Sequence, residues 1–244
     1  MAKYFGNIVK TGKLGGSVFA VRYGQTIERQ YQPIVANPQT SAQVEARVKL
    51  KLLSQLAAIM TPHSGFKRVG SKTARNMFIK ANYPDVSVSS STGNPSLVDA
   101  VQELAAIKMT TGLLDLPSLT LTNNSTSVSV HLSVGANDDV DMVVYASYVI
   151  DESGNLIAKD LTRTDEPGNN RTFAATIPVD MNFVRRFVVY AYGISFRSDR
   201  ARAQYQNMQV TNVSSEATLQ AIRNMSENDA LFTRSVFGGV QGEL

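Results

Sequence analysis

The chain of 244 residues contains no cysteine, no tryptophan and only two histidines. Without cysteine there is no disulfide framework, no thiolate nucleophile and no cysteine-ligated zinc site. Zero cysteine suits a reducing cytoplasm, and it equally suits a virus particle or a secreted protein. His63 and His131 have no carboxylate at ligand spacing, so neither indicates a metal site by itself. We expect no metal and no cofactor.

Long apolar runs and targeting signals are also missing. The stretch LLSQLAAIM, residues 52–60, is among the longest apolar runs and falls far short of the ~20 residues that a membrane span needs. No charged segment followed by an apolar one opens the chain, which argues against a signal peptide. We therefore expect no membrane partner.

Catalytic motifs are absent as well. The stretch GKLGGS, residues 12–17, lacks the order of a phosphate-binding loop, and no G-x-S-x-G nucleophile turn occurs. A triad assembled in space stays open, but nothing in the sequence supports one, so we predict that the protein is not an enzyme. Asp138, Asp139 and Asp141 form an acidic cluster without the EF-hand pattern. Calcium binding and an ordinary acidic connection both stay open there, and the connection is the commoner case.

Charge, by contrast, is plentiful and unevenly distributed. Residues 1–83 hold thirteen Lys and Arg against two acids, a net charge of +11, and residues 84–244 hold eleven against eighteen, a net charge of −7. Such segregation gives one part of the molecule a positive field that attracts polyanions. A nucleic acid would therefore meet the N-terminal part. Pairing of basic and acidic parts between copies of the chain explains the same asymmetry.

The basic residues define the candidate site. We predict a nucleic-acid-binding surface made of Lys10, Lys13, Arg22, Arg29, Arg47, Lys51, Lys67, Arg68, Lys72 and Arg75. Aromatic residues lie among them, and basic surfaces with interleaved rings bind single strands by combining charge with stacking. The aromatic residues are Tyr4, Phe5, Tyr23 and Tyr31. Alternatively, the same rings simply cover a thin sheet and bind no ligand.

The expected fold class is α+β, beginning with a basic module over residues 1–83. Residues 4–32 indicate an antiparallel meander with a turn at Tyr23-Gly24. Thr40 is the expected N-cap of a helix, with Gln43 completing a capping box. An apolar stripe then runs at helical spacing through Val44, Val48, Leu52, Leu56 and Ile59. A second short helix is expected from a Ser71 cap up to Pro84.

Residues 84–96 are rich in Ser, Gly and Pro and indicate a linker, followed by a β-sandwich over residues 97–211. A weak helical pattern covers residues 97–108, and alternation with period two takes over from about residue 117. Seven short strands match an immunoglobulin or fibronectin type III plan, and the missing Cys and Trp favour the fibronectin type. The predicted strands are 118–122, 125–134, 141–150, 154–161, 171–179, 185–196 and 200–210. Arg200 and Arg202 would protect an edge strand or contact an anion.

Residues 212–244 are expected to form a C-terminal helix and an apolar tail. Leu219, Ile222 and Met225 lie on one side of the predicted helix. The tail carries Leu231, Phe232, Val236 and Phe237, so it either folds back or docks on a neighbour. Docking would make the protein a homo-oligomer, and this is the arrangement that we predict.

Residues 37–47 follow the pattern N-P-x-T-x-A-Q-x-x-x-R, after the lead-in GKLGGSVFAVRYGQTIERQYQP at residues 12–33. This stretch resembles a little-characterised family of phage proteins, found in gokushovirus-type microviruses and in Bacteroidota genomes. VVYAYGISFRSD, residues 188–199, resembles a strand pair in the sandwich-like region of those relatives. The resemblance implies a phage protein made in the cytoplasm of a host bacterium, located in the virion or in that cytoplasm and associated with the virion or the genome. It brings no catalytic residues.

Two functions follow from these observations. The leading one is a non-enzymatic structural protein of a phage particle, whose basic module contacts nucleic acid or an acidic surface of another virion protein. The alternative is a single-stranded-DNA-binding protein that acts in replication or packaging outside the particle.

Overall fold

The computed structural model describes residues 3–5, 9–14, 16–22, 25–31, 40–87, 103–112, 118–134, 140–164 and 172–242. The predicted turn at Tyr23-Gly24, most of the predicted linker and two of the three clustered aspartates lie outside these residues. The chain divides into two compact units, Met1–Gln43 and Val44–Leu244.

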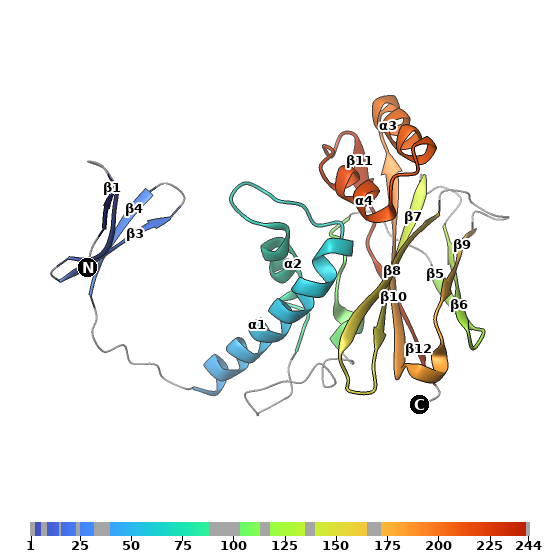
Figure 1. Ribbon diagram of the computed structural model, residues 1–244, viewed down its shortest axis with the longest axis horizontal. Helices are drawn as coiled ribbons and strands as arrows, with labels where there is room; N and C mark the ends of the chain where they lie inside the picture. The colour runs from blue at the N-terminus through green and yellow to red at the C-terminus, as the bar shows by residue number, and fades with distance from the viewer. Residues whose placement is uncertain are drawn as a thin grey trace. The chain divides into compact units, whose positions relative to one another are not determined.

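The first unit is the predicted antiparallel meander. Its strands β1 (Lys3–Phe5), β2 (Val9–Leu14), β3 (Ser17–Arg22) and β4 (Gln25–Gln30) lie in the order β1-β2-β3-β4. All six residues of β4 are exposed. Among the described residues of this unit, no second layer of structure lies on the sheet (Figure 1).

The second unit contains two antiparallel sheets in a sandwich-like arrangement. The three-stranded sheet has the order β5-β6-β9, with β5 (Ser118–Asn123), β6 (Ser127–Ser133) and β9 (Thr172–Pro178). The five-stranded sheet has the order β11-β10-β7-β8, and β12 also pairs with β10. Its strands are β7 (Met142–Ile150), β8 (Leu156–Thr164), β10 (Arg186–Phe196), β11 (Ala230–Phe232) and β12 (Val236–Gln241). The first six predicted strands are thereby confirmed.

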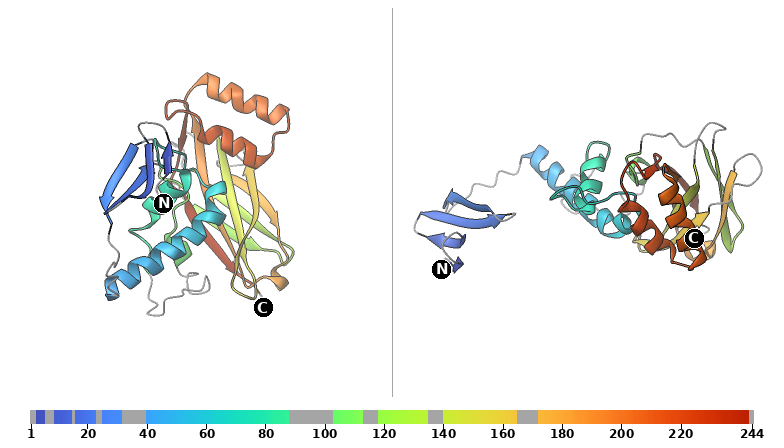
Figure 2. Two further views of the ribbon diagram at one scale, coloured as in Figure 1. Left: turned by 60° about the vertical axis from the view of Figure 1, so that its left-hand side comes forward. Right: turned by 90° about the horizontal axis from the view of Figure 1, so that it is seen from above.

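The five-stranded sheet is the middle of three layers. The three-stranded sheet lies on one side of it and the helices α1 and α2 lie on the other (Figures 1 and 2). Residues of β7 and β10 are therefore buried on both faces. The Tyr145 hydroxyl donates to the Phe173 carbonyl 2.7 Å away, across to the smaller sheet. The Tyr190 hydroxyl donates to the Leu104 carbonyl 2.7 Å away, towards the opposite layer.

Helix α1 (Ser41–Met60) begins directly after Thr40, as predicted, and the Gln43 amide donates to the Thr40 carbonyl at 3.0 Å. Its buried residues are Val48, Leu52, Leu53, Leu56, Ala57 and Met60. A short 3-10 turn, Thr61–His63, follows it. Helix α2 (Ala74–Asn82) is capped by Thr73, whose side chain accepts from the Asn76 amide, so the predicted cap at Ser71 is wrong by two residues.

The boundary predicted between residues 83 and 84 does not separate two compact units. Leu52, Leu56 and Phe78 belong to the same buried cluster as Tyr148 and Tyr190 of the sandwich. The apolar faces of α1 and α2 are thus covered by the β-sheet unit, and the division falls between Gln43 and Val44. Two further 3-10 turns, Glu103–Ala106 and Met181–Phe183, lie within this second unit.

The predicted strand over residues 200–210 is wrong, because this segment is the helix α3 (Asp199–Val210). Ser198 caps it by accepting from the Ala201 amide. Ala201 and Tyr205 are its buried residues and lie four positions apart, which is helical spacing. The alternation Arg-Ala-Arg-Ala suggested a strand only because four residues are too few to separate a period of two from one of 3.6.

The C-terminal segment forms the predicted helix, α4 (Ser215–Arg223), with Leu219 and Ile222 buried. The tail after it folds back. Phe237 pairs with Tyr190, and Phe232 pairs with Ile194, so β12 and β11 extend the sheet of their own chain. The apolar tail therefore gives no reason to expect a homo-oligomer, since its side chains are used within the chain. No helix among the described residues is long and apolar enough to cross a membrane.

Candidate nucleic-acid interface

One face of the N-terminal sheet gathers most of its positive charge. Residues opposite each other in an antiparallel sheet share a face, and residues two apart along a strand do so as well. Val18 lies opposite both Lys13 on β2 and Arg29 on β4, so all three share one face. Positions 3 and 22 belong to this face by the same register. We call Lys13, Arg29 and positions 3 and 22 the basic sheet face.

An aromatic ring completes the basic sheet face. The Tyr31 amide donates to the Gly16 carbonyl at 2.6 Å, which continues the pairing of β4 with β3. Tyr31 follows Arg29 by two residues and so lies on the same face. The Lys13 ammonium lies 3.5 Å from the centroid of the Tyr31 ring, a cation–π contact. Lys13 and Arg29 are both exposed.

The opposite face of this sheet has a different character. Lys10 pairs with Tyr4, and Glu28 pairs with Phe19, which places these positions on the other face. Glu28 is the single acidic residue of the first unit. Of the four site residues predicted in this unit, Lys13, Arg22 and Arg29 are thus brought together and Lys10 is not. The register also adds Lys3, which the sequence-based set omitted.

The other six predicted site residues belong to the second unit. Arg47 and Lys51 lie one turn apart on α1, and both are exposed, away from the buried stripe. The Arg75 guanidinium donates to the Ser54 carbonyl at 2.7 Å and so links α2 to α1. The Lys67 ammonium donates to the Met225 carbonyl at 3.2 Å, beyond the end of α4. Arg75 and Lys67 therefore connect elements of the fold in addition to carrying charge.

The remaining two lie in the loop between the helices. The Arg68 guanidinium donates to the Gly70 carbonyl at 3.0 Å. Lys72 is exposed, and its backbone pairs with Val69 in a tight turn. The prediction of a single surface therefore divides into two groups, one on the first compact unit and one on the second.

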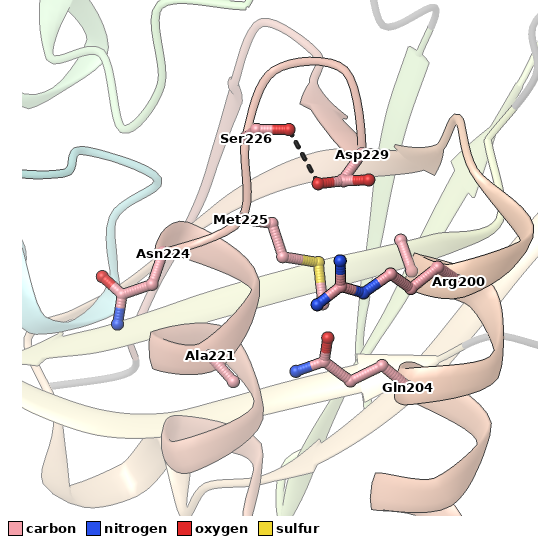
Figure 3. A pocket seen from close by; sticks show the side chains of 8 residues that line it. Arg200, Gln204, Ala221, Asn224, Met225, Ser226 and Asp229 are labelled. Atoms are coloured by element: carbon pink, nitrogen blue, oxygen red, sulfur yellow. Dashed lines mark hydrogen bonds between the residues drawn. The ribbon is translucent and has the colours of Figure 1, made fainter.

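A polar pocket lies between α3 and α4, and its cavity volume is about 270 Å³ (Figure 3). Arg200 and Gln204 extend into it from α3, and Asn224 borders it from the end of α4. Asp229 accepts hydrogen bonds of 2.7 Å from the hydroxyls of Ser226 and Ser198, and these bonds hold the pKa of its carboxyl below the usual range. The pocket thus holds one fixed negative and one positive charge, a poor match for a polyanion.

The described residues contain no group of three or more His, Asp or Glu side chains that could hold a metal ion. Of the three clustered aspartates, Asp141 is described. Its carboxylate accepts from the Phe196 amide at 2.6 Å and from the Arg202 guanidinium at 3.2 Å. Asp141 therefore joins the end of β10 to α3, a structural role. His63 is buried, with Nε2 3.4 Å from the Glu216 carboxylate.

Comparison of the chain with protein-family models and with curated proteins found no match. The geometry of the basic sheet face is therefore the basis for the functional argument.

Proposed function

We propose that the protein is a non-enzymatic structural component of a phage particle, and that its N-terminal sheet contacts nucleic acid. The single observation that carries this proposal is the gathering of Lys13 and Arg29 with positions 3 and 22 on one sheet face, away from Glu28. A surface with several cations and no carboxylate attracts phosphates without regard to base sequence.

The second unit would then be the part that contacts other virion proteins or spaces the sheet from them. The second unit holds 19 Lys and Arg against 19 Asp and Glu, a net charge of zero, whereas the first unit holds five against one, a net charge of +4. The first unit therefore attracts phosphates more strongly than the second. We also propose that the sandwich-like part of the second unit is a fibronectin type III domain. We propose as well that the chain belongs to the phage family that residues 37–47 resemble. If the partner is an acidic protein surface instead of nucleic acid, it would bind the same cations of the basic sheet face.

The alternative is a single-stranded-DNA-binding protein that stays outside the particle. Mass spectrometry of purified particles separates the two functions. A structural component is present in a fixed ratio to the major coat protein after nuclease treatment and gradient purification. If the chain is missing from such particles but abundant in infected cells, the structural proposal is wrong and the alternative is favoured.

Binding itself is measured with the full chain. A fragment of residues 1–83 would expose Leu52, Leu56 and Phe78, which are buried in the second unit. We expect the affinity of the full chain for an oligonucleotide to fall steeply as salt rises, because bound cations release counterions from phosphates. Affinity that is undetectable at low salt, or insensitive to salt, would contradict phosphate binding.

A further inference from the structure

We propose that Lys13 and Tyr31 form a nucleotide-binding pair, and that the basic sheet face takes single-stranded nucleic acid in preference to other polyanions. This inference rests on the proposed function and names its ligand more closely. In the bound state a base stacks on the Tyr31 ring, and the Lys13 ammonium moves from the ring to the adjoining phosphate.

The geometry places both groups of the pair next to further cations. Tyr31 extends β4 beside Gly16, and Lys13 lies on β2 two strands away. Their side chains meet across β3, with the ammonium 3.5 Å from the ring centroid. Arg29 lies on the same face, two residues before Tyr31. A strand whose base reaches the ring therefore has its backbone within reach of at least two cations.

The exchange of partners is favourable because the free pair is held weakly. A cation–π contact on an exposed surface contributes little, since water solvates the ammonium nearly as well. Tyr31 keeps 38% of its surface exposed beside this lysine. A base covers more of the ring than an ammonium does, and the displaced lysine gains an ion pair with phosphate. Each group of the pair thus has a better partner in a nucleotide.

Base stacking explains why the ligand is single-stranded. In a duplex the bases stack on one another and their faces are closed to a protein ring. A single strand can turn one base onto a flat sheet while its phosphates follow the cations. An acidic protein surface would use the lysine and arginine but not the ring.

The test compares variants of the full chain for binding to two probes by fluorescence anisotropy. The probes are an oligothymidylate and an abasic oligonucleotide of the same length, which has the phosphates without the bases. We expect Tyr31→Leu to weaken oligothymidylate binding about tenfold or more, and to leave the affinity for the abasic strand within about twofold. Tyr31→Phe should keep most of the affinity because it keeps the ring.

Tyr83 provides a matched control. It is also 38% exposed and lies under a lysine, with the Lys49 ammonium 4.7 Å from its ring centroid, but it belongs to the second unit. Tyr83→Leu should leave binding of both probes unchanged.

The outcomes separate this inference from the function on which it rests. If wild type binds oligothymidylate but Tyr31→Leu has no effect, or weakens both probes equally, the nucleotide-binding pair is wrong and polyanion binding stands. If neither probe binds wild type at low salt, the proposed function fails and this inference fails with it. Circular dichroism and the retained affinity of Tyr31→Phe show whether the sheet is folded.

Discussion

The Tyr192 hydroxyl on the central strand β10 donates a 2.7 Å hydrogen bond to the carbonyl oxygen of His63, the last residue of the 3-10 turn that follows α1. Both residues are buried, and they are 129 positions apart in the sequence. This bond ties the helical layer to the middle of the sheet. It shows that α1 is part of the second unit and not an extension of the N-terminal meander.

Two tyrosines of this layer should respond in opposite ways to removal of the hydroxyl. Tyr192→Phe leaves the buried His63 carbonyl without its partner, so we expect a loss of about 1–3 kcal/mol in the free energy of unfolding. Tyr148 is also fully buried, but no described residue offers its hydroxyl a hydrogen bond. Tyr148→Phe should therefore be neutral or stabilising. Urea unfolding measures both, and equal losses would contradict this assignment.

Alkaline pH should destabilise the protein through the same residues. Burial raises the pKa of Tyr145, Tyr148, Tyr190 and Tyr192 well above the ordinary value of about 10. Because the unfolded chain ionises first, the contribution of these tyrosines to stability is unchanged below about pH 10 and falls above it, until the folded tyrosines ionise as well. Absorbance of tyrosinate should therefore rise in two stages, the second coinciding with loss of near-ultraviolet circular dichroism. A single stage near pH 10 would contradict the burial.

Helix α1 should contribute to the stability of the sandwich. Leu56 is fully buried against it, so Leu56→Ala should cost about 2–5 kcal/mol in the free energy of unfolding. Leu50 lies on the same helix and is 49% exposed, so Leu50→Ala should change stability by no more than about 0.5 kcal/mol. Thermal unfolding followed at tyrosine wavelengths gives both values. A small effect of Leu56→Ala would place α1 outside this core.

The folded-back tail can be tested at a glycine that contacts it. A methyl group at Gly112 would overlap the Phe232 carbonyl of β11, so Gly112→Ala should cost about 1–3 kcal/mol or more. Gly239 lies on β12, where the nearest atom to such a methyl would be the Arg186 Nε at 3.4 Å, and Gly239→Ala should be tolerated better. Unfolding curves of the two variants check this. If both are equally stable, β11 does not lie against Gly112.

The elements that the sequence predicts well are those with a long local pattern. Helix α1 carries its apolar stripe from Val44 to Ile59 and has a clear start at Thr40, and β6 alternates over seven residues. The strands β11 and β12 have no such signal, because they form by pairing with β10, whose partner residues lie 34 or more positions earlier in the chain. Long-range pairing of this kind cannot be read from short apolar segments.

The candidate site was predicted by residue type but not by arrangement. Counting charges identifies Lys13, Arg22 and Arg29, yet it also includes Lys10, which the register places on the opposite face. Lys67 and Arg75 were chosen for their charge, and each also bonds a backbone carbonyl of another element. Strand register and side-chain partners decide these roles, and neither follows from composition.

The salt dependence of binding tests the central claim most directly. Lys13→Gln with Arg29→Gln removes two charges from the basic sheet face, and Lys159→Gln, exposed on β8, serves as the control. For a single strand each phosphate contact contributes about 0.7 to the slope of log affinity against log salt. We predict that the double variant has a slope shallower by about 1.4 and that the control keeps the wild-type slope. An unchanged slope in the double variant would contradict the account.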